Sequence, residues 1–178
     1  MSKTFGCRMS GTEWFERSRR SVLRLCAVQR ELDALTESEE TGPGGAGHGD
    51  SGPRQKNATS DPVSAAAIAH DGVVARIAEL TRQRDGLEAA RLALCRVIDG
   101  MRLALGDGYA DVMAAYYLYG PELAYTGRGC TWQDVADRAG VSLRTAMRRR
   151  SVASDWLEDV GVSGAMAGMF TKGDRDGK

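Results

Sequence analysis

The chain has few of the features that mark secreted, membrane-bound and metal-binding proteins. Aromatic residues make up 6% of its 178 positions, and the four cysteines form no C-x-x-C pair and have neither histidine near them in the sequence. No apolar run approaches the roughly 20 residues that a helix needs to cross a bilayer. The N-terminus also lacks the apolar centre of a signal peptide. We therefore predict a cytoplasmic protein with reduced cysteines, no metal site and no membrane contact.

Sequence patterns of catalysis are also missing. There is no H-E-x-x-H, no P-loop and no supported Ser-His-Asp set. A formal G-x-G-x-x-G occurs at 42–47, but a dinucleotide fingerprint needs a strand before it and a helix after it. Here a predicted helix precedes the motif and more glycine follows it. The sequence thus predicts a protein that is not an enzyme and uses no cofactor.

Charge is distributed in blocks, although the formal net charge is zero. The segment 128–150 holds six arginines against two acids, Asp134 and Asp137, and the ten residues after it turn acidic. A solvated helix face usually mixes its signs, so this arginine block indicates a surface for phosphate. Codon usage in a GC-rich genome is an alternative reason for the excess of 20 arginines over 4 lysines.

Two long helices are predicted in the first half of the chain. One spans residues 11–39 with Thr12 as its N-cap, and the other begins at Asp61-Pro62 and ends at Gly106. Six of the eleven residues at 42–52 are glycine, which predicts a flexible loop over 41–60. Both helices carry apolar residues at spacings of three and four, as coiled coils do. The first seam comprises Val22, Leu25, Val28, Leu32 and Leu35, and the second Val63, Ala66, His70, Val73, Ile77, Leu80, Leu87, Leu94, Ile98, Met101 and Leu105.

These seams need a partner, because neither helix can bury its leucines alone. An antiparallel hairpin of residues 11–105 is the economical solution. Pairing between two chains, which would give a homodimer through the hairpin, is the alternative, and the seams allow both. Gly72, Gly86 and Gly100 lie inside the second helix and permit bends or breaks. We expect His70 to be packed on the seam.

A helix-turn-helix is predicted near the C-terminus. Thr131 is a good N-cap with Asp134 as a weaker capping-box acid, and Gly140 supplies the left-handed residue that ends a helix. Ser142 then caps a second, arginine-rich helix. Ala136 provides the small side chain that two steeply crossing helices need at their contact. This order of residues is what a DNA-reading helix pair requires. Two amphipathic core helices joined by a glycine turn are the alternative.

A compact domain over residues 107–160 would contain this pair. A third helix at Tyr109–Gly120 is expected to cover its apolar faces, with its tyrosines in the core rather than stacked on bases. Trp132 and Trp156 are expected to complete that core. Residues 161–178 have too few bulky side chains to pack well and are predicted to form a flexible tail.

Residues 131–157 resemble the last DNA-binding region of sigma-70-type factors. The preceding helix and the long helical first half extend this resemblance to phage late-gene regulators of the RinA and ArpU type. Ala146 stands where the pattern prefers Val or Ile, and Arg150 where an apolar residue is usual. The residues in register are Thr131, Val135, Ala136, Gly140, Ser142, Thr145, Arg149, Ala153 and Leu157.

The predicted DNA-binding residues fall into two groups. Phosphate contacts are expected from Arg128, Arg138, Arg144, Arg148, Arg149 and Arg150. Base edges are expected to meet Ser142, Leu143, Arg144, Met147, Arg148 and Ser151, and Thr145 belongs to the same predicted surface. Only Arg144 and Arg148 are placed for a bidentate guanine contact. Bracing of the fold by Arg149, through acids on the preceding helix, remains an alternative.

The sequence therefore predicts an all-α protein, a long coiled-coil-like hairpin followed by a sigma-like helix-turn-helix domain. The resemblance implies sequence-specific binding of double-stranded DNA, regulation of phage or prophage late genes, and contact with RNA polymerase in the nucleoid of a bacterial host. Two alternatives remain open at this point. One is a small terminase subunit that recognises DNA for packaging, and the other is a helical adaptor that binds RNA polymerase.

Overall fold

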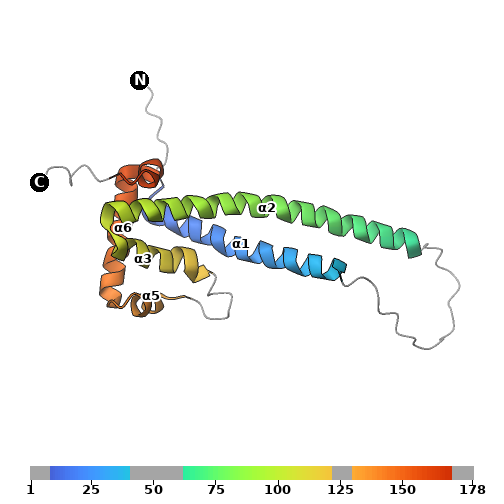
Figure 1. The fold of residues 1–178 in the computed structure, drawn as a ribbon, viewed down its shortest axis with the longest axis horizontal. Helices are drawn as coiled ribbons and strands as arrows, with labels where there is room; N and C mark the ends of the chain where they lie inside the picture. Colours follow the sequence, from blue (N-terminus) through green and yellow to red (C-terminus); the bar gives the residue numbers. More distant parts are fainter. Residues whose placement is uncertain (1–8, 41–61, 122–129, 170–178) are drawn as a thin grey trace, which may run out of the picture. The chain divides into compact units, whose positions relative to one another are not determined.

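The computed structural model describes residues 9–40, 62–121 and 130–169. Every secondary-structure element within these residues is helical, which confirms the predicted all-α class (Figure 1). None of the described helices is both long and apolar enough to cross a membrane. The elements are α1 (Gly11–Glu40), α2 (Pro62–Leu105), α3 (Asp107–Met113), the π-helix η1 (Ala114–Tyr119), α5 (Trp132–Arg138) and α6 (Leu143–Met166).

Contacts divide the chain into two compact units, one within residues 1–26 and 86–178 and the other within 27–85. Helices α1 and α2 each contribute one part to either unit. These two units do not follow the predicted division into a hairpin of residues 11–105 and a separate domain of residues 107–160. The first turns of α1 and the last turns of α2 belong to the same unit as α5 and α6.

The unit of residues 27–85 is a helix pair. Val28, Leu32 and Leu80 are buried in it, as the seam predicted. Arg76 joins the two helices through an ion pair of 2.6 Å from Nη2 to Oε1 of Glu31. His70 is exposed rather than packed.

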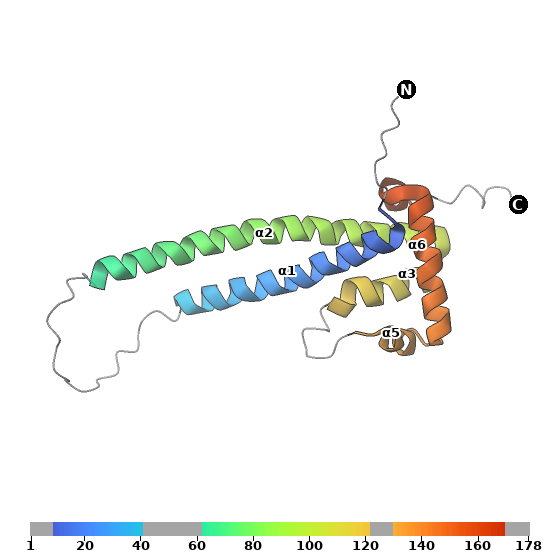
Figure 2. The ribbon, with the colours of Figure 1, turned by 180° about the vertical axis from the view of Figure 1, so that it is seen from behind.

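The other unit is built around one main core. Phe15 and Val22 of α1 lie in it, although the sequence argument gave Phe15 no role. Helix α6 crosses the beginning of α1 and the end of α2, as both ribbon views show (Figures 1 and 2). The remaining buried members of the core are Leu94, Val97, Ile98, Met101, Ala110, Met113, Ala114, Tyr117, Leu118, Ala153, Trp156, Leu157 and Ala165.

The ends of the long helices agree with the sequence in part. Helix α2 begins at Pro62 and ends before Gly106 as predicted, and it continues through its three internal glycines without a break. Helix α1 is capped by Ser10 rather than Thr12. The Ser10 amide donates to Glu13 Oε2 at 3.0 Å, and the Glu13 amide donates to Ser10 Oγ at 3.2 Å. This reciprocal pair is a capping box, and it lies just ahead of the predicted position.

The predicted flexible tail is wrong for residues 161–169, while residues 170–178 lie outside the described chain. Gly161, at φ 70°, kinks α6 and lets it continue to Met166. Ala165 is fully buried, and the Trp156 indole donates from Nε1 to the Met169 carbonyl oxygen at 3.0 Å. Small residues pack here by close backbone approach, so bulky side chains are not needed.

Candidate nucleic-acid interface

Helix α5 starts with the predicted capping box. The Asp134 amide donates to Thr131 Oγ1 at 3.2 Å, and the Thr131 amide donates to Asp134 Oδ2 at 2.7 Å. Hydrogen bonds from the Thr131 hydroxyl and amide stabilise the carboxylate and lower the pKa of Asp134. The N-terminal end of the pair is thus fixed by interactions within four residues of the chain.

The turn between α5 and α6 also has the predicted chemistry. Gly140 adopts φ 62°, which a glycine reaches without a Cβ clash. The Val141 amide donates to the Ala136 carbonyl oxygen at 3.0 Å, and the Thr145 amide donates to Ser142 Oγ at 3.1 Å. Ala136 is fully buried, together with Ala146 of α6. They lie in a second small core with Val112, Ala115 and Val135.

Seven of the predicted DNA-binding residues are exposed on this helix pair. No described carboxylate forms an ion pair with any of the three arginines among them. Leu143 is 41% exposed and Met147 39%, so two apolar side chains of α6 are also accessible to solvent. The exposed residues are Arg138, Ser142, Leu143, Arg144, Met147, Arg148 and Ser151.

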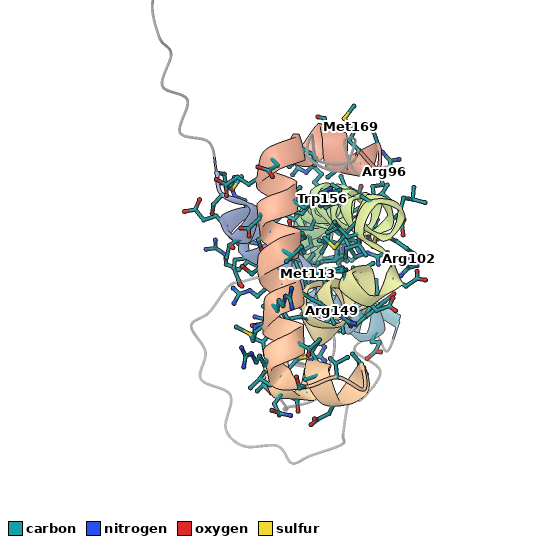
Figure 3. All side chains as sticks on the ribbon, turned by 90° about the vertical axis from the view of Figure 1, so that its left-hand side faces the viewer. Arg96, Arg102, Met113, Arg149, Trp156 and Met169 are labelled. Atoms are coloured by element: carbon teal, nitrogen blue, oxygen red, sulfur yellow. The ribbon has the colours of Figure 1, made fainter. Side chains whose placement is uncertain are left out.

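Arg149 contacts the fold instead of facing solvent. Its Nη1 donates to the carbonyl oxygen of Gly108 at 3.1 Å, and its Cζ lies 5.9 Å from the ring centre of Tyr109 (Figure 3). The alternative to phosphate contact by Arg149 was bracing through acids on the preceding helix, whereas its partner here is a backbone carbonyl. A Cβ at position 108 would lie 2.9 Å from that Cζ, so glycine makes the room for the guanidinium.

Arg150 is also directed inward. Its Nε donates to the Tyr117 hydroxyl at 3.2 Å, its Nη2 lies 3.4 Å from Glu16 Oε1, and its Cζ lies 5.2 Å from the ring centre of Trp132. Burial raises the pKa of Tyr117, which therefore stays protonated and donates to Glu16 Oε1 at 3.1 Å. We call Glu16, Tyr117 and Arg150 the polar triad. It joins α1, η1 and α6.

Two other predicted residues lie off the exposed face. The Thr145 hydroxyl is half-buried and lies 2.9 Å from Ser142 Oγ, so it takes part in the cap of α6. Arg128 lies outside the described residues. The exposed face of the α5–α6 pair thus holds fewer of the predicted arginines than the sequence indicated.

Aromatic side chains pack next to the α5–α6 pair. Tyr116 stacks on Trp132 with ring centres 4.0 Å apart, and Arg19 covers the Tyr116 ring at 4.5 Å. Tyr117 is fully buried, whereas Tyr119 is 51% exposed. The prediction of a core role is therefore confirmed for two of the three tyrosines.

Sequence reasoning gave Glu16 no role, and it placed Tyr117 in the core without predicting its hydrogen bond to Arg150. One signal was present, since Arg150 occupies a position where the sigma-like pattern has an apolar residue. An arginine at such a position needs a carboxylate or ring to accompany it inside the fold.

Replacing Arg150 with alanine should destabilise the protein by about 1–3 kcal/mol, because it removes charge-assisted hydrogen bonds and a ring contact from a half-buried site. Arg148→Ala is the matched variant on the exposed side and should change stability by less than about 0.5 kcal/mol. Chemical denaturation of both variants measures the difference. Equal stabilities would contradict the inward placement of Arg150.

The described residues contain no group of three or more His, Cys, Asp or Glu side chains that could hold a metal ion. Comparisons with protein-family models, curated proteins and solved structures found no match. No relative thus supports or opposes the sigma-like resemblance.

Proposed function

We propose that the α5–α6 pair binds double-stranded DNA with sequence preference, and that the protein regulates transcription of phage or prophage late genes, as the sigma-like resemblance implies. The observation that carries this proposal is the difference in surroundings among the arginines of α6. Arg149 and Arg150 are held by the fold, while Arg144 and Arg148 project outward without a described acidic partner. Contact with RNA polymerase belongs to the same proposal.

The exposed arginines are spaced for groove reading. Arg144 and Arg148 are four residues apart, so they lie on one side of α6 about one turn from each other. A guanidinium group can donate to O6 and N7 of guanine at once. Leu143 is exposed at the start of the helix, where an apolar side chain can contact a thymine methyl group.

Electrostatics favour phosphate binding at the N-terminal end of α6. Arg144 lies in the first turn of α6, and no acidic residue occurs there. A cation in that turn is unfavourable for the helix by about 0.3–1 kcal/mol, because the helix dipole is positive at its N-terminus. The arrangement therefore does not serve the stability of α6, whereas it attracts phosphate.

Duplex binding should weaken steeply as salt is raised, because the arginines displace condensed counterions. If Arg148 reads guanine, Arg148→Ala should cost about 1–3 kcal/mol on the preferred sequence alone. If it contacts phosphate, binding should weaken on all sequences and the salt slope should fall by about one. Fluorescence anisotropy across a salt series distinguishes these results.

Arg96→Ala is the control, because it removes one exposed arginine from α2 instead of α6. It should leave the affinity on the preferred sequence unchanged. A binding constant that does not change with salt would contradict the DNA proposal and favour the RNA polymerase adaptor.

A further inference from the structure

The outer side of α6 carries a continuous polar stripe. Arg144, Arg148, Ser151, Asp155 and Asp159 are all exposed. Their spacings of four, three, four and four residues keep them on one side of a helix that has 3.6 residues per turn. We call these five residues the outer stripe.

Charge along the outer stripe changes sign at its middle. Two arginines occupy its N-terminal half, two aspartates its C-terminal half, and Ser151 lies between them. This order opposes the one that the helix dipole favours, which is acidic at the N-terminus and basic at the C-terminus. Among the described residues, none forms an ion pair with the four charged members. The stripe therefore neither stabilises its own helix nor serves an intramolecular contact.

The charges of the outer stripe are complementary to those of a second, antiparallel copy of the stripe. A two-fold axis near Ser151 brings Arg144 opposite the partner's Asp159, and Arg148 opposite the partner's Asp155. The two other pairs follow from the symmetry, because an isologous interface repeats every contact. Ser151 is small, so two helices can approach each other closely at the axis.

We propose that the outer stripe of α6 binds the same stripe of a second copy of this chain, in antiparallel orientation. Charge complementarity along the full stripe selects this occupant. The contact is weak and depends on salt, since exposed ion pairs contribute little and are screened over about 10 Å at 0.1 M ionic strength. The half-exposed Leu143 and Met147 border the stripe and add apolar contact.

This pairing would regulate DNA binding, a consequence that rests on the proposed function. Arg144 and Arg148 cannot contact duplex and the partner's aspartates at the same time. The dimer is then the form that does not bind DNA, and duplex shifts the protein to the monomer by mass action.

Sedimentation velocity of the full chain at low and high salt tests the pairing. Wild type should form a dimer at low salt that dissociates as salt is raised. Arg148→Glu and Asp155→Arg should each weaken the dimer by about tenfold or more, because every reversal places two like-charge pairs in the interface. The double variant should restore the dimer, since the exchanged charges at positions 148 and 155 again attract each other across the interface.

Arg96→Glu is the control, since it makes the same charge change on α2 and should leave the dimer unchanged. A monomer at every salt concentration would overturn the proposal. A dimer that survives both single reversals would also overturn it and assign self-association to another surface, such as the helical hairpin.

Failure of the proposed function can be told apart from failure of the pairing. Asp155→Arg should weaken the dimer and still bind duplex in the anisotropy assay. If no variant binds duplex while the charge reversals act as expected, the pairing stands and its competition with DNA is wrong.

Discussion

Gly100→Ala should lower the melting temperature of the protein, even though alanine favours a helix over glycine by about 1 kcal/mol. A Cβ at position 100 would overlap the carbonyl oxygen of Ala165 and lie 2.9 Å from its carbonyl carbon. Both atoms belong to the backbone of α6, so no side chain can move aside. Overpacking of this kind typically costs about 1–3 kcal/mol, which exceeds the gain in helix propensity.

Gly86→Ala is the matched control in the same helix. Nothing lies within 4 Å of a Cβ at this position, and the residue is exposed. This variant should therefore be more stable than wild type by up to about 1 kcal/mol. Thermal melting followed by circular dichroism compares the two changes. If both variants melted above wild type, α2 and α6 would not meet at Gly100 as described.

The parts of the fold that the sequence predicted correctly are those determined by short-range interactions. The capping box of Thr131 and Asp134 and the cap of Ser142 over Thr145 each join residues three apart. The left-handed Gly140 needs no distant partner either. Such features depend on a few neighbouring residues, so a single sequence is enough to recognise them.

Long-range contacts account for the features of the fold that the sequence did not predict. Arg150 reaches Glu16 across 134 residues, and Tyr117 reaches it across 101. No local sequence pattern predicts contacts between residues so far apart. For the same reason, the first turns of α1 were assigned to a separate hairpin. The π-helix at Ala114–Tyr119 also had no recognisable signal in the sequence.

The assignment of the arginines could have been better from the sequence alone. Arg149 and Arg150 lie three and four residues after Ala146, and Ala153 lies seven after it. These spacings mark the buried side of an amphipathic helix. The charge of the arginine block was given more weight than its periodicity. Helical spacing would have placed Arg144 and Arg148 on the exposed side of the helix. It would have placed Arg149 and Arg150 on the buried side.

Phe15→Ala should destabilise the protein by about 3–5 kcal/mol, the usual cost of emptying a buried aromatic site. Phe15 is fully buried, and its ring centre lies 5.1 Å from that of Tyr117. Tyr117 in turn holds Arg150, so the loss should also loosen α6 and weaken any duplex binding. Denaturant unfolding and anisotropy measure the two effects.

Leu92→Ala provides the comparison, because this leucine is 52% exposed on α2. Its removal should change the free energy of unfolding by less than about 0.5 kcal/mol. The contrast decides whether α1 belongs to the core that carries α5 and α6. If Phe15→Ala unfolded at the same denaturant concentration as Leu92→Ala, the first turns of α1 would not support that core. A separately folding domain of residues 107–160 would then be the correct division of the chain.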